Sequence, residues 1–542
     1  MNQQSEKFFN TAGPAQEDIH YTLDPLRRIN YEEVSSLITQ RKYFVLHAPR
    51  QTGKTTSLLA MVRQINDEGL RYCVYFNVEA AQTARNDVQR GMTAILSRLE
   101  SAVEHLLKRR LPNEPAEFIA GRGADAALVA ALESFCEKLD KPLVLFIDEI
   151  DALIGDTLVS VLRQLRDGYA SRPGRAPVSV ILCGVRDVRD YRIHMSSGDI
   201  ITGGSCFNVK AKSLRLGNFS EDDIRELYGQ HTAATGQVFE ENIYPKIWDL
   251  TWGQPWLVNA LAHQATWEMR ENRDRTRPIT LKVIEEAANH LILERATHLD
   301  QLADKLREPR VRRVLESLLA GENWKSDPPE DDIQYVLDLG LLRRDRTGVL
   351  VIANGIYREV LPRQLSGVMQ DKLAGVFPRT PQIKEDGSLN MPGLLSAFQQ
   401  FFRENSESWL ERFDYKEAGF QLLLQAFLQR IVNGGGQIDR EYALGRKRVD
   451  LLVRWRHPPG VERKSQEEQR IVLELKTLRE NSQGFKRVLS EGLEQTFGYA
   501  DLTNASEAHL IICDERSGRA WDEKIFDRVE RYGGKEIHLW GM

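Results

Sequence analysis

The sequence predicts an α/β protein of several domains, and three observations support this prediction. The chain has 542 residues, and because a domain usually holds roughly 100–200 residues, about three or four domains are expected. Hydrophobic residues make up 42% and charged residues 28%, a composition that excludes collagen-like, mucin-like and wholly disordered chains. Short apolar β-branched runs alternate with longer helical stretches, which is typical of a parallel sheet covered by helices.

The N-terminal half contains the expected strands and helices of one such sheet. Four apolar runs predict parallel strands at 43–47, 72–78, 143–148 and 178–183. The segment 87–139 has helical periodicity with breaks at 112–115 and 121–123. From 221 to 303 the sequence is almost entirely helical, with a break at 252–255. We therefore predict a core over 1–220 and a helical lid over 221–303.

The C-terminal half predicts two further modules joined by a linker. Two helices and the strand 348–352 indicate a winged helix over 304–375, although several small modules share this order of elements. Polar residues with proline and glycine predict a linker at 376–392. A second α/β domain is expected over 393–542. Its predicted elements are a helix at 418–432, strands near 448–455, 470–475, 509–513 and 536–540, and a helix near 489–502.

Charge, cysteines and hydropathy restrict the function classes. Lys and Arg number 73 and Asp and Glu 78, a net charge of −5, which neither indicates nor excludes a nucleic-acid partner. The five cysteines form no CxxC pair and no zinc-ligand spacing, which fits a reducing cytoplasm. The N-terminus is polar, and the apolar run 143–147 is far shorter than the ~20 residues of a membrane span. We expect a cytoplasmic protein without a membrane partner.

The first strand leads into a phosphate-binding loop, which runs from Ala48 to Thr56 and is followed by a periodic helix. In this context backbone N–H groups and a helix N-terminus hold a phosphate chain. Gly53 lets the backbone approach the phosphates, Lys54 reaches the outer phosphates, and Thr55 supplies a hydroxyl to Mg²⁺. Ala48 stands where the pattern has glycine. The alternative is that Gly-Lys-Thr occurs by chance in a turn before a helix. The flanking strand and helix favour nucleotide binding by residues 53–56.

Two later strand ends carry further candidates. The strand 143–148 ends in Asp148 and Glu149, where Asp148 is expected to hold Mg²⁺ through water and Glu149 to polarise the attacking water. Arg186 follows the strand 178–183, at the position of a γ-phosphate sensor. A surface arginine paired with Asp187 or Asp190 is an equal alternative for Arg186.

This order of motifs, with Gly253-Gln254-Pro255 in the lid, resembles the AAA+-related ATPases of the STAND and archaeal-ATPase type over about 20–365. The resemblance implies a P-loop NTPase sheet, ATP as the nucleotide, and a nucleotide-sensing role for Pro255, although a plain helix-breaking turn is an alternative. It also implies a homo-oligomer, since such sites commonly borrow an arginine from a neighbour. Arg172, in the loop 166–175, is a candidate for that arginine; an ordinary surface loop is the commoner case.

The C-terminal domain carries a carboxylate and lysine pattern on two consecutive strands. Asp450 begins one strand, and Glu474 and Lys476 share one face of the next. Carboxylate oxygens can hold Mg²⁺ beside a scissile phosphate while a lysine orients water, so the group suits phosphodiester hydrolysis. A polar sheet face with alternating charges is the alternative.

These residues resemble the PD-(D/E)XK superfamily of restriction-endonuclease-like nucleases. The resemblance implies Glu417 as a further metal ligand, and Gln495 and Tyr499, an i,i+4 helical pair, as residues that contact the substrate or steady the site. Val449 stands where the name-giving proline often lies. Mn²⁺ is an alternative to Mg²⁺ in this site. Basic residues on both sides of Asp450 could neutralise phosphates.

The two patterns together predict an ATP-regulated, Mg²⁺-dependent nuclease that cleaves DNA or RNA; DNA is the favoured partner, although the residues do not distinguish the two. Because prokaryotic ATPase–nuclease fusions often serve in defence, the resemblance also implies protection against phages or mobile DNA. The alternative is an ATP-switched regulator that binds DNA or a partner, whose nuclease-like domain only docks nucleic acid. A small-molecule phosphotransferase would use the phosphate-binding loop but leave the C-terminal residues unexplained.

Overall fold

The computed structural model of the chain divides into two compact units. One comprises Met1–Ala296 and Ile333–Gly355, and the other Thr297–Asp332 and Ile356–Met542. The structure describes residues 7–187, 191–194, 200–293, 305–319, 328–361, 383–384, 386–410, 420, 424, 427–428, 436–444, 447–455, 468–478, 484–514, 516 and 519–542. Within these ranges, no helix has the length and apolar character needed to cross a membrane.

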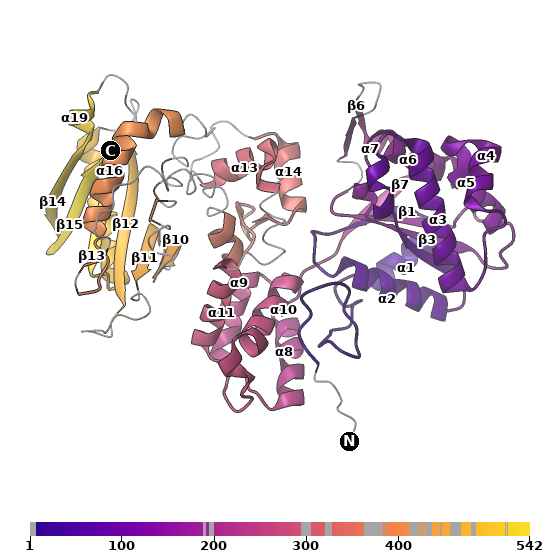
Figure 1. Cartoon of the computed structure of the whole chain (residues 1–542), viewed down its shortest axis with the longest axis horizontal. Coiled ribbons are helices and arrows are strands. Elements are labelled where there is room, and N and C mark those ends of the chain that lie inside the picture. The colour runs from indigo at the N-terminus through magenta and orange to yellow at the C-terminus, as the bar shows by residue number, and fades with distance from the viewer. Residues whose placement is uncertain are drawn as a thin grey trace. The chain divides into compact units, whose positions relative to one another are not determined.

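A five-stranded parallel sheet forms the centre of the first unit (Figure 1). Its strand order is β2-β3-β4-β1-β7, with β1 Tyr43–His47, β2 Tyr72–Asn77, β3 Leu143–Asp148, β4 Ser179–Gly184 and β7 Lys210–Arg215. The four predicted strands are confirmed to within one residue at each end. β7 was not predicted, because it is an edge strand whose half-exposed sequence has little apolar alternation.

Helices cover both faces of this sheet. They are α1 Tyr31–Thr39, α2 Lys54–Asp67, α3 Val88–Leu107, α4 Pro115–Arg122, α5 Ala124–Cys136, α6 Gly155–Asp167 and the short α7 Gly203–Cys206. The helical segment predicted over 87–139, with its two breaks, is confirmed as α3, α4 and α5. A small hairpin, β5 Arg192–His194 with β6 Ile200–Thr202, precedes α7.

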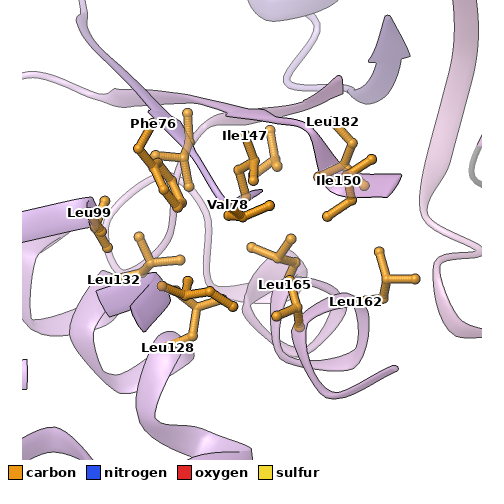
Figure 2. Close-up of a cluster of buried hydrophobic side chains, with 14 of the residues drawn as sticks. Phe76, Val78, Leu99, Leu128, Leu132, Ile147, Ile150, Leu162, Leu165 and Leu182 are labelled. Atoms are coloured by element: carbon orange, nitrogen blue, oxygen red, sulfur yellow. The ribbon is translucent and has the colours of Figure 1, made fainter. Parts of the chain in front are cut away.

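Apolar side chains fill the layer between one sheet face and helices α3, α5 and α6. Figure 2 shows Phe76, Ile147 and Leu182 from strands β2, β3 and β4 packed toward Leu128 and Leu162 of the helices. Burying each large apolar side chain stabilises the fold by about 1.5–3 kcal/mol. The opposite sheet face packs a second apolar cluster against α1 and α2. This packing fixes the strand ends, where the polar candidates lie.

Four helices form the segment predicted as a lid: α8 Glu221–Thr235, α9 Tyr244–Thr251, α10 Pro255–His263 and α11 Leu281–Leu293. The break predicted at 252–255 is confirmed, because α9 ends at Thr251 and Trp252 and Gly253 have φ angles of 47° and 68°. A Cβ at Gly253 would lie 2.0 Å from the Phe219 carbonyl oxygen. Only glycine fits this turn.

The segment predicted as a winged helix contains α13 Pro309–Leu319, α14 Glu330–Asp338 and an antiparallel hairpin of β8 Leu342–Arg344 with β9 Leu350–Ile352. Helix, helix and hairpin follow one another in the predicted order. The division between the two units falls within this segment. The winged helix and the predicted domain borders remain predictions.

The second unit contains a six-stranded mixed sheet with the order β10-β11-β12-β13-β15-β14. β12, β13 and β15 run parallel, and β10, β11 and β14 are antiparallel to their neighbours. The strands are β10 Gly436–Leu444, β11 Lys447–Trp455, β12 Gln469–Leu478, β13 Glu507–Asp514, β14 Phe526–Tyr532 and β15 Lys535–Gly541; the helices are α16 Met391–Leu410, α18 Phe485–Leu502 and α19 Trp521–Lys524.

The elements predicted at 448–455, 470–475, 489–502, 509–513 and 536–540 are confirmed in this unit. α16 was not predicted, and it begins at Met391, inside the predicted linker 376–392, most of which lies outside the described residues. Pro392 led to the linker prediction, although proline is common in the first turn of a helix. Most of the predicted helix 418–432 also lies outside the described residues.

Candidate functional site

The phosphate-binding loop connects β1 to α2, and its shape depends on Gly53. Gly53 has a φ of 74° and is the N-cap of α2, which begins at Lys54. A Cβ at Gly53 would lie 2.8 Å from Nη2 of Arg28. The left-handed backbone therefore favours glycine, and a larger residue would also have to displace the Arg28 guanidinium. The free N–H groups of the first helical turn point to the loop, where an anion is favoured.

Lys54 lies beside the two carboxylates, Asp148 and Glu149, that were predicted to share its site. Its side chain is 7% exposed, and Nζ lies 3.4 Å from Oε1 of Glu149 and 3.9 Å from Oδ1 of Asp148. Burial by itself would lower the pKa of Lys54, but the two carboxylates outweigh burial and raise it. Thr55 donates a hydrogen bond to Oδ2 of Asp148 at 3.2 Å. Four predicted residues therefore meet at one edge of the sheet.

Asp148 is fully buried and held from three sides. Besides Thr55, the Tyr75 hydroxyl donates to its Oδ2 at 2.9 Å and the Glu149 amide donates to its Oδ1 at 2.9 Å. Tyr75 was not predicted as a site residue. The signal for it in the sequence is that it lies on β2, a strand expected to lie in the same sheet as the strand that ends in Asp148. The register confirms this, because Tyr75 pairs with Phe146 and Asn77 with Asp148.

Glu149 lies where the backbone turns sharply after β3. Its φ is 57°, in the left-handed region that non-glycine residues seldom adopt. Burial raises the pKa of Glu149, Lys54 opposes the shift, and Asp151 and Asp148 add to it. A carboxylate with a raised pKa is a better proton acceptor for water than an ordinary surface glutamate.

Arg28 fastens the phosphate-binding loop and was not predicted. Its Nη1 donates to the carbonyl oxygens of Thr52 at 2.5 Å and Gly217 at 3.1 Å, and its guanidinium lies 5.1 Å from the centre of the Phe219 ring. Burial lowers the pKa of Arg28 to about 10, and Asp223 opposes the shift. No local sequence motif marks this residue, because its partners come from two segments that are distant in the sequence.

A cavity of about 140 Å³ adjoins the loop. Arg28, Gly53 and Thr56 line one side, and Pro255 and Trp256 of α10 line the other. Thr56 accepts a hydrogen bond from the Ala15 amide at 3.1 Å. Pro255 therefore lies beside the phosphate-binding loop, as expected from the resemblance, and lid and core face one cavity.

Arg186 and Arg172 both stack on tyrosine rings. The Arg186 guanidinium lies 4.5 Å from the ring centre of Tyr191 and 5.0 Å from that of Tyr335. Arg172 lies 3.4 Å from the ring centre of Tyr169 and donates to the Tyr169 carbonyl oxygen at 2.6 Å and to the carbonyl oxygen of Arg41. These contacts hold Arg172 within its own domain, so they favour a structural role over donation to a neighbouring subunit.

Asp187 forms a buried ion pair with Lys210. Asp190, the other expected partner of Arg186, lies outside the described residues.

The C-terminal candidates lie side by side on β11 and β12. Leu451 pairs with Leu473, so Asp450 and Glu474 are neighbours across the two strands. Asp450 Oδ2 accepts a hydrogen bond from the Leu475 amide at 2.8 Å, and Lys476 Nζ lies 2.6 Å from Glu474 Oε1. The predicted trio is therefore one group.

Glu474 has the properties of a buried metal ligand. It is 3% exposed, and burial together with Asp450 raises its pKa to about 7, while Lys476 opposes the shift. Its Oε2 has no hydrogen-bond partner among the described residues. A buried carboxylate oxygen without a partner costs about 1–3 kcal/mol or more, and a bound cation would remove that cost. Hard oxygen donors suit Mg²⁺ or Mn²⁺, so these residues fit a divalent cation.

The remaining nuclease candidates differ in their surroundings. Tyr499 is buried against Leu452 and Val472, which favours a packing role, whereas Gln495 is exposed on α18. Glu417 lies outside the described residues, and within them no group of three or more His, Cys, Asp or Glu could hold a metal.

The match to a family model lies in the first unit. Residues 38–191 match the family model described as the AAA domain. The phosphate-binding segment of this chain is similar to an AAA domain. The matched residues include Lys54, Asp148, Glu149 and Arg186. No curated protein matches the chain.

Three solved structures are among those similar to this chain. A Walker-type ATPase of Pyrococcus abyssi has 14% identity and a TM-score of 0.44, with 65% of this chain and 99% of that chain covered. The ORC2 protein of Aeropyrum pernix, solved with ADPNP and ADP, has 15% identity and a TM-score of 0.40, with 64% and 95% covered. The RuvB branch-migration motor of Thermotoga maritima has 14% identity and a TM-score of 0.32, with 61% and 96% covered.

Proposed function

We propose that the AAA-like segment binds and hydrolyses ATP. The observation that carries this proposal is the meeting of Lys54, Thr55, Asp148 and Glu149 beside the loop fixed by Gly53. The first turn of α2 and Lys54 would hold the phosphates, and Mg²⁺ held by Thr55 and Asp148 would neutralise their charge. The nucleoside would occupy the cavity between Arg28 and Pro255.

The ion pairs of Lys54 indicate how the site responds to ATP. Without a phosphate, the charge of Lys54 is balanced by Glu149 and Asp148. A phosphate would draw Lys54 away from Glu149, and the freed carboxylate could then accept a proton from the attacking water. Pro255, at the start of α10, would transmit the presence of nucleotide to the lid.

The substitution Glu149→Gln tests this assignment, because glutamine keeps the shape of the side chain but accepts no proton. We expect ATP to bind within about threefold of wild type and hydrolysis to fall by about 10²–10⁴-fold. Calorimetry measures binding and phosphate release measures the rate. Glu32→Gln, at an exposed position of α1, is the matched control and should leave both unchanged. Hydrolysis at the wild-type rate in Glu149→Gln would contradict the assignment.

We infer that the second unit hydrolyses phosphodiester bonds of DNA or RNA with a divalent cation, with DNA as the favoured substrate to test first. The observation that carries this is the buried Glu474 with an unpartnered Oε2, next to Asp450 and Lys476. Asp450 and Glu474 would hold the cation, which supplies Lewis-acid stabilisation of the phosphate charge. Lys476 would orient the attacking water, and Glu417 and Gln495 remain predicted contributors.

Metal binding separates this proposal from the regulator that only docks nucleic acid. Calorimetric titration of the full chain with Mn²⁺ should show binding at a site that Asp450→Ala and Glu474→Gln abolish. Glu530→Gln, on strand β14, is the control variant and should retain it. The same heat in wild type and Glu474→Gln would favour the regulator. Protection of a host against phages stays a prediction from the resemblance.

A further inference from the structure

A second hollow in the first unit lies between α2, β2 and α3, away from the phosphate-binding loop. Its volume is about 810 Å³, within the range of about 300–1,000 Å³ typical of small-molecule sites. Its apolar lining comes from Leu59 and Val62 of α2, Phe76 of β2, and Ala102 and Leu106 of α3. Such a lining suits the apolar body of a ligand. We refer to this hollow as the α2–α3 cleft.

Two arginines from different helices line the α2–α3 cleft: Arg63 of α2 and Arg98 of α3. Neither forms an ion pair or a hydrogen bond with any residue that the structure describes. Glu79 also lines the cleft but is paired with neither arginine, and Asn77 and His105 are further polar lining residues. A guanidinium group matches phosphate and carboxylate with two parallel hydrogen bonds. Two such groups beside an apolar surface favour an amphipathic anion.

Tyr75 connects the α2–α3 cleft to the nucleotide site. It lines the cleft, and its hydroxyl donates to Oδ2 of Asp148 at 2.9 Å. The same carboxylate oxygen accepts the hydrogen bond from Thr55. A ligand that displaces Tyr75 would therefore change the position or charge of Asp148, the residue proposed to hold Mg²⁺.

We propose that the α2–α3 cleft binds a small organic anion with an aromatic or aliphatic body and a phosphate or carboxylate group, and that its binding changes the rate of ATP hydrolysis through Tyr75. The rate effect rests on the proposed ATPase function, whereas the binding does not. The concave shape and the mixed apolar and arginine lining favour a small molecule over nucleic acid, which binds through many more cationic groups.

Matched naphthalene probes test the binding. 1-Naphthyl phosphate, 1-naphthoate and neutral 1-naphthol are titrated calorimetrically into the full chain saturated with ADP, so that the nucleotide site is closed to them. We expect at least one anion to bind more tightly than the naphthol, and the double variant Arg63→Ala, Arg98→Ala to weaken it by about tenfold or more. The phosphate and carboxylate arms show which anion the cleft prefers.

The control is the double variant Arg122→Ala, Arg163→Ala, which removes two exposed arginines of α4 and α6 from the same domain. It should bind like wild type. The proposal fails if the naphthol binds as well as both anions, or if the two double variants bind alike. It also fails if light scattering shows that only Arg63→Ala, Arg98→Ala lowers the oligomer mass, because the cleft would then face a second copy.

The substitution Tyr75→Phe tests the coupling, because it keeps the ring in the cleft and removes the hydroxyl. The anion that binds should change the hydrolysis rate of wild type by at least about twofold and leave that of Tyr75→Phe unchanged, with affinity within about threefold of wild type. An equal rate change in both proteins would overturn the role of Tyr75. If the wild type binds the anion but does not hydrolyse ATP, the ATPase proposal is refuted, whereas the proposal that the α2–α3 cleft binds an anion is not.

Discussion

At the scale of single residues, both candidate sites place a lysine against buried carboxylates. Lys54 faces Glu149 and Asp148 in one unit, and Lys476 faces Glu474 in the other. A buried carboxylate without a partner is costly, so each lysine stabilises the site before any phosphate or metal is bound. The same lysines are the groups that a phosphate would attract.

Glu474 should make the second unit sensitive to pH. Its pKa of about 7 in the fold lies above its usual value near 4.5, so the folded state holds a proton that the unfolded state releases between those values. Stability therefore falls as pH rises from about 4.5 to 7, by up to about 3 kcal/mol. Hydrogen exchange of the β11 and β12 amides in EDTA, at pH 5 and pH 8, measures this change.

The variant Glu474→Gln is the test of that assignment, because an amide does not titrate. Its β12 amides should lose most of the pH dependence, and Mn²⁺ at pH 8 should protect the wild type but not the variant. If the β12 amides of Glu474→Gln keep the pH dependence of the wild type, the group that titrates is not Glu474.

At the scale of elements, the turn between α9 and α10 sets where Pro255 and Trp256 meet the loop. Gly253→Ala forces a Cβ against the Phe219 carbonyl and keeps a left-handed backbone. We expect a loss of unfolding free energy of at least about 2 kcal/mol and weaker nucleotide binding. Gly236→Ala is the matched control: its φ is 77° and its Cβ would meet nothing within 4 Å, so about 1 kcal/mol is expected. Thermal unfolding and calorimetry compare the two variants; equal losses would contradict the steric argument.

The elements that the sequence predicts well are those with a strong apolar period or a motif. The strands β1 and β3 are buried on both faces, and the helix α3 is buried along one stripe. Their apolar residues alone are therefore enough to predict them. β7 and β14 are edge strands with charged, half-exposed sequences, and their strand state comes from pairing with β1 and β15. Local sequence carries little information about such pairing.

At the scale of the whole molecule, the sequence predicts the motif residues of each site better than the residues that hold them in place. Lys54, Asp148 and Glu149 follow strands of one parallel sheet, and Asp450 and Glu474 occupy neighbouring strands, so adjacency follows from topology. Arg28 and Tyr75 reach the first site from other segments. Tyr499 fits a motif but packs in the core. Tertiary contacts of this kind cannot be read from spacing.

Because one chain combines an AAA-like segment with the Asp450 and Glu474 carboxylates, we propose as the central claim that ATP regulates DNA cleavage. The most direct measurement follows the cleavage of DNA with Mg²⁺, with and without ATP, by wild type, Lys54→Ala and Asp450→Ala. We predict that ATP changes the cleavage rate of wild type, that Lys54→Ala does not respond to ATP, and that Asp450→Ala does not cut. Cleavage by Asp450→Ala at the wild-type rate, or no cleavage by wild type under any of these conditions, would contradict the claim.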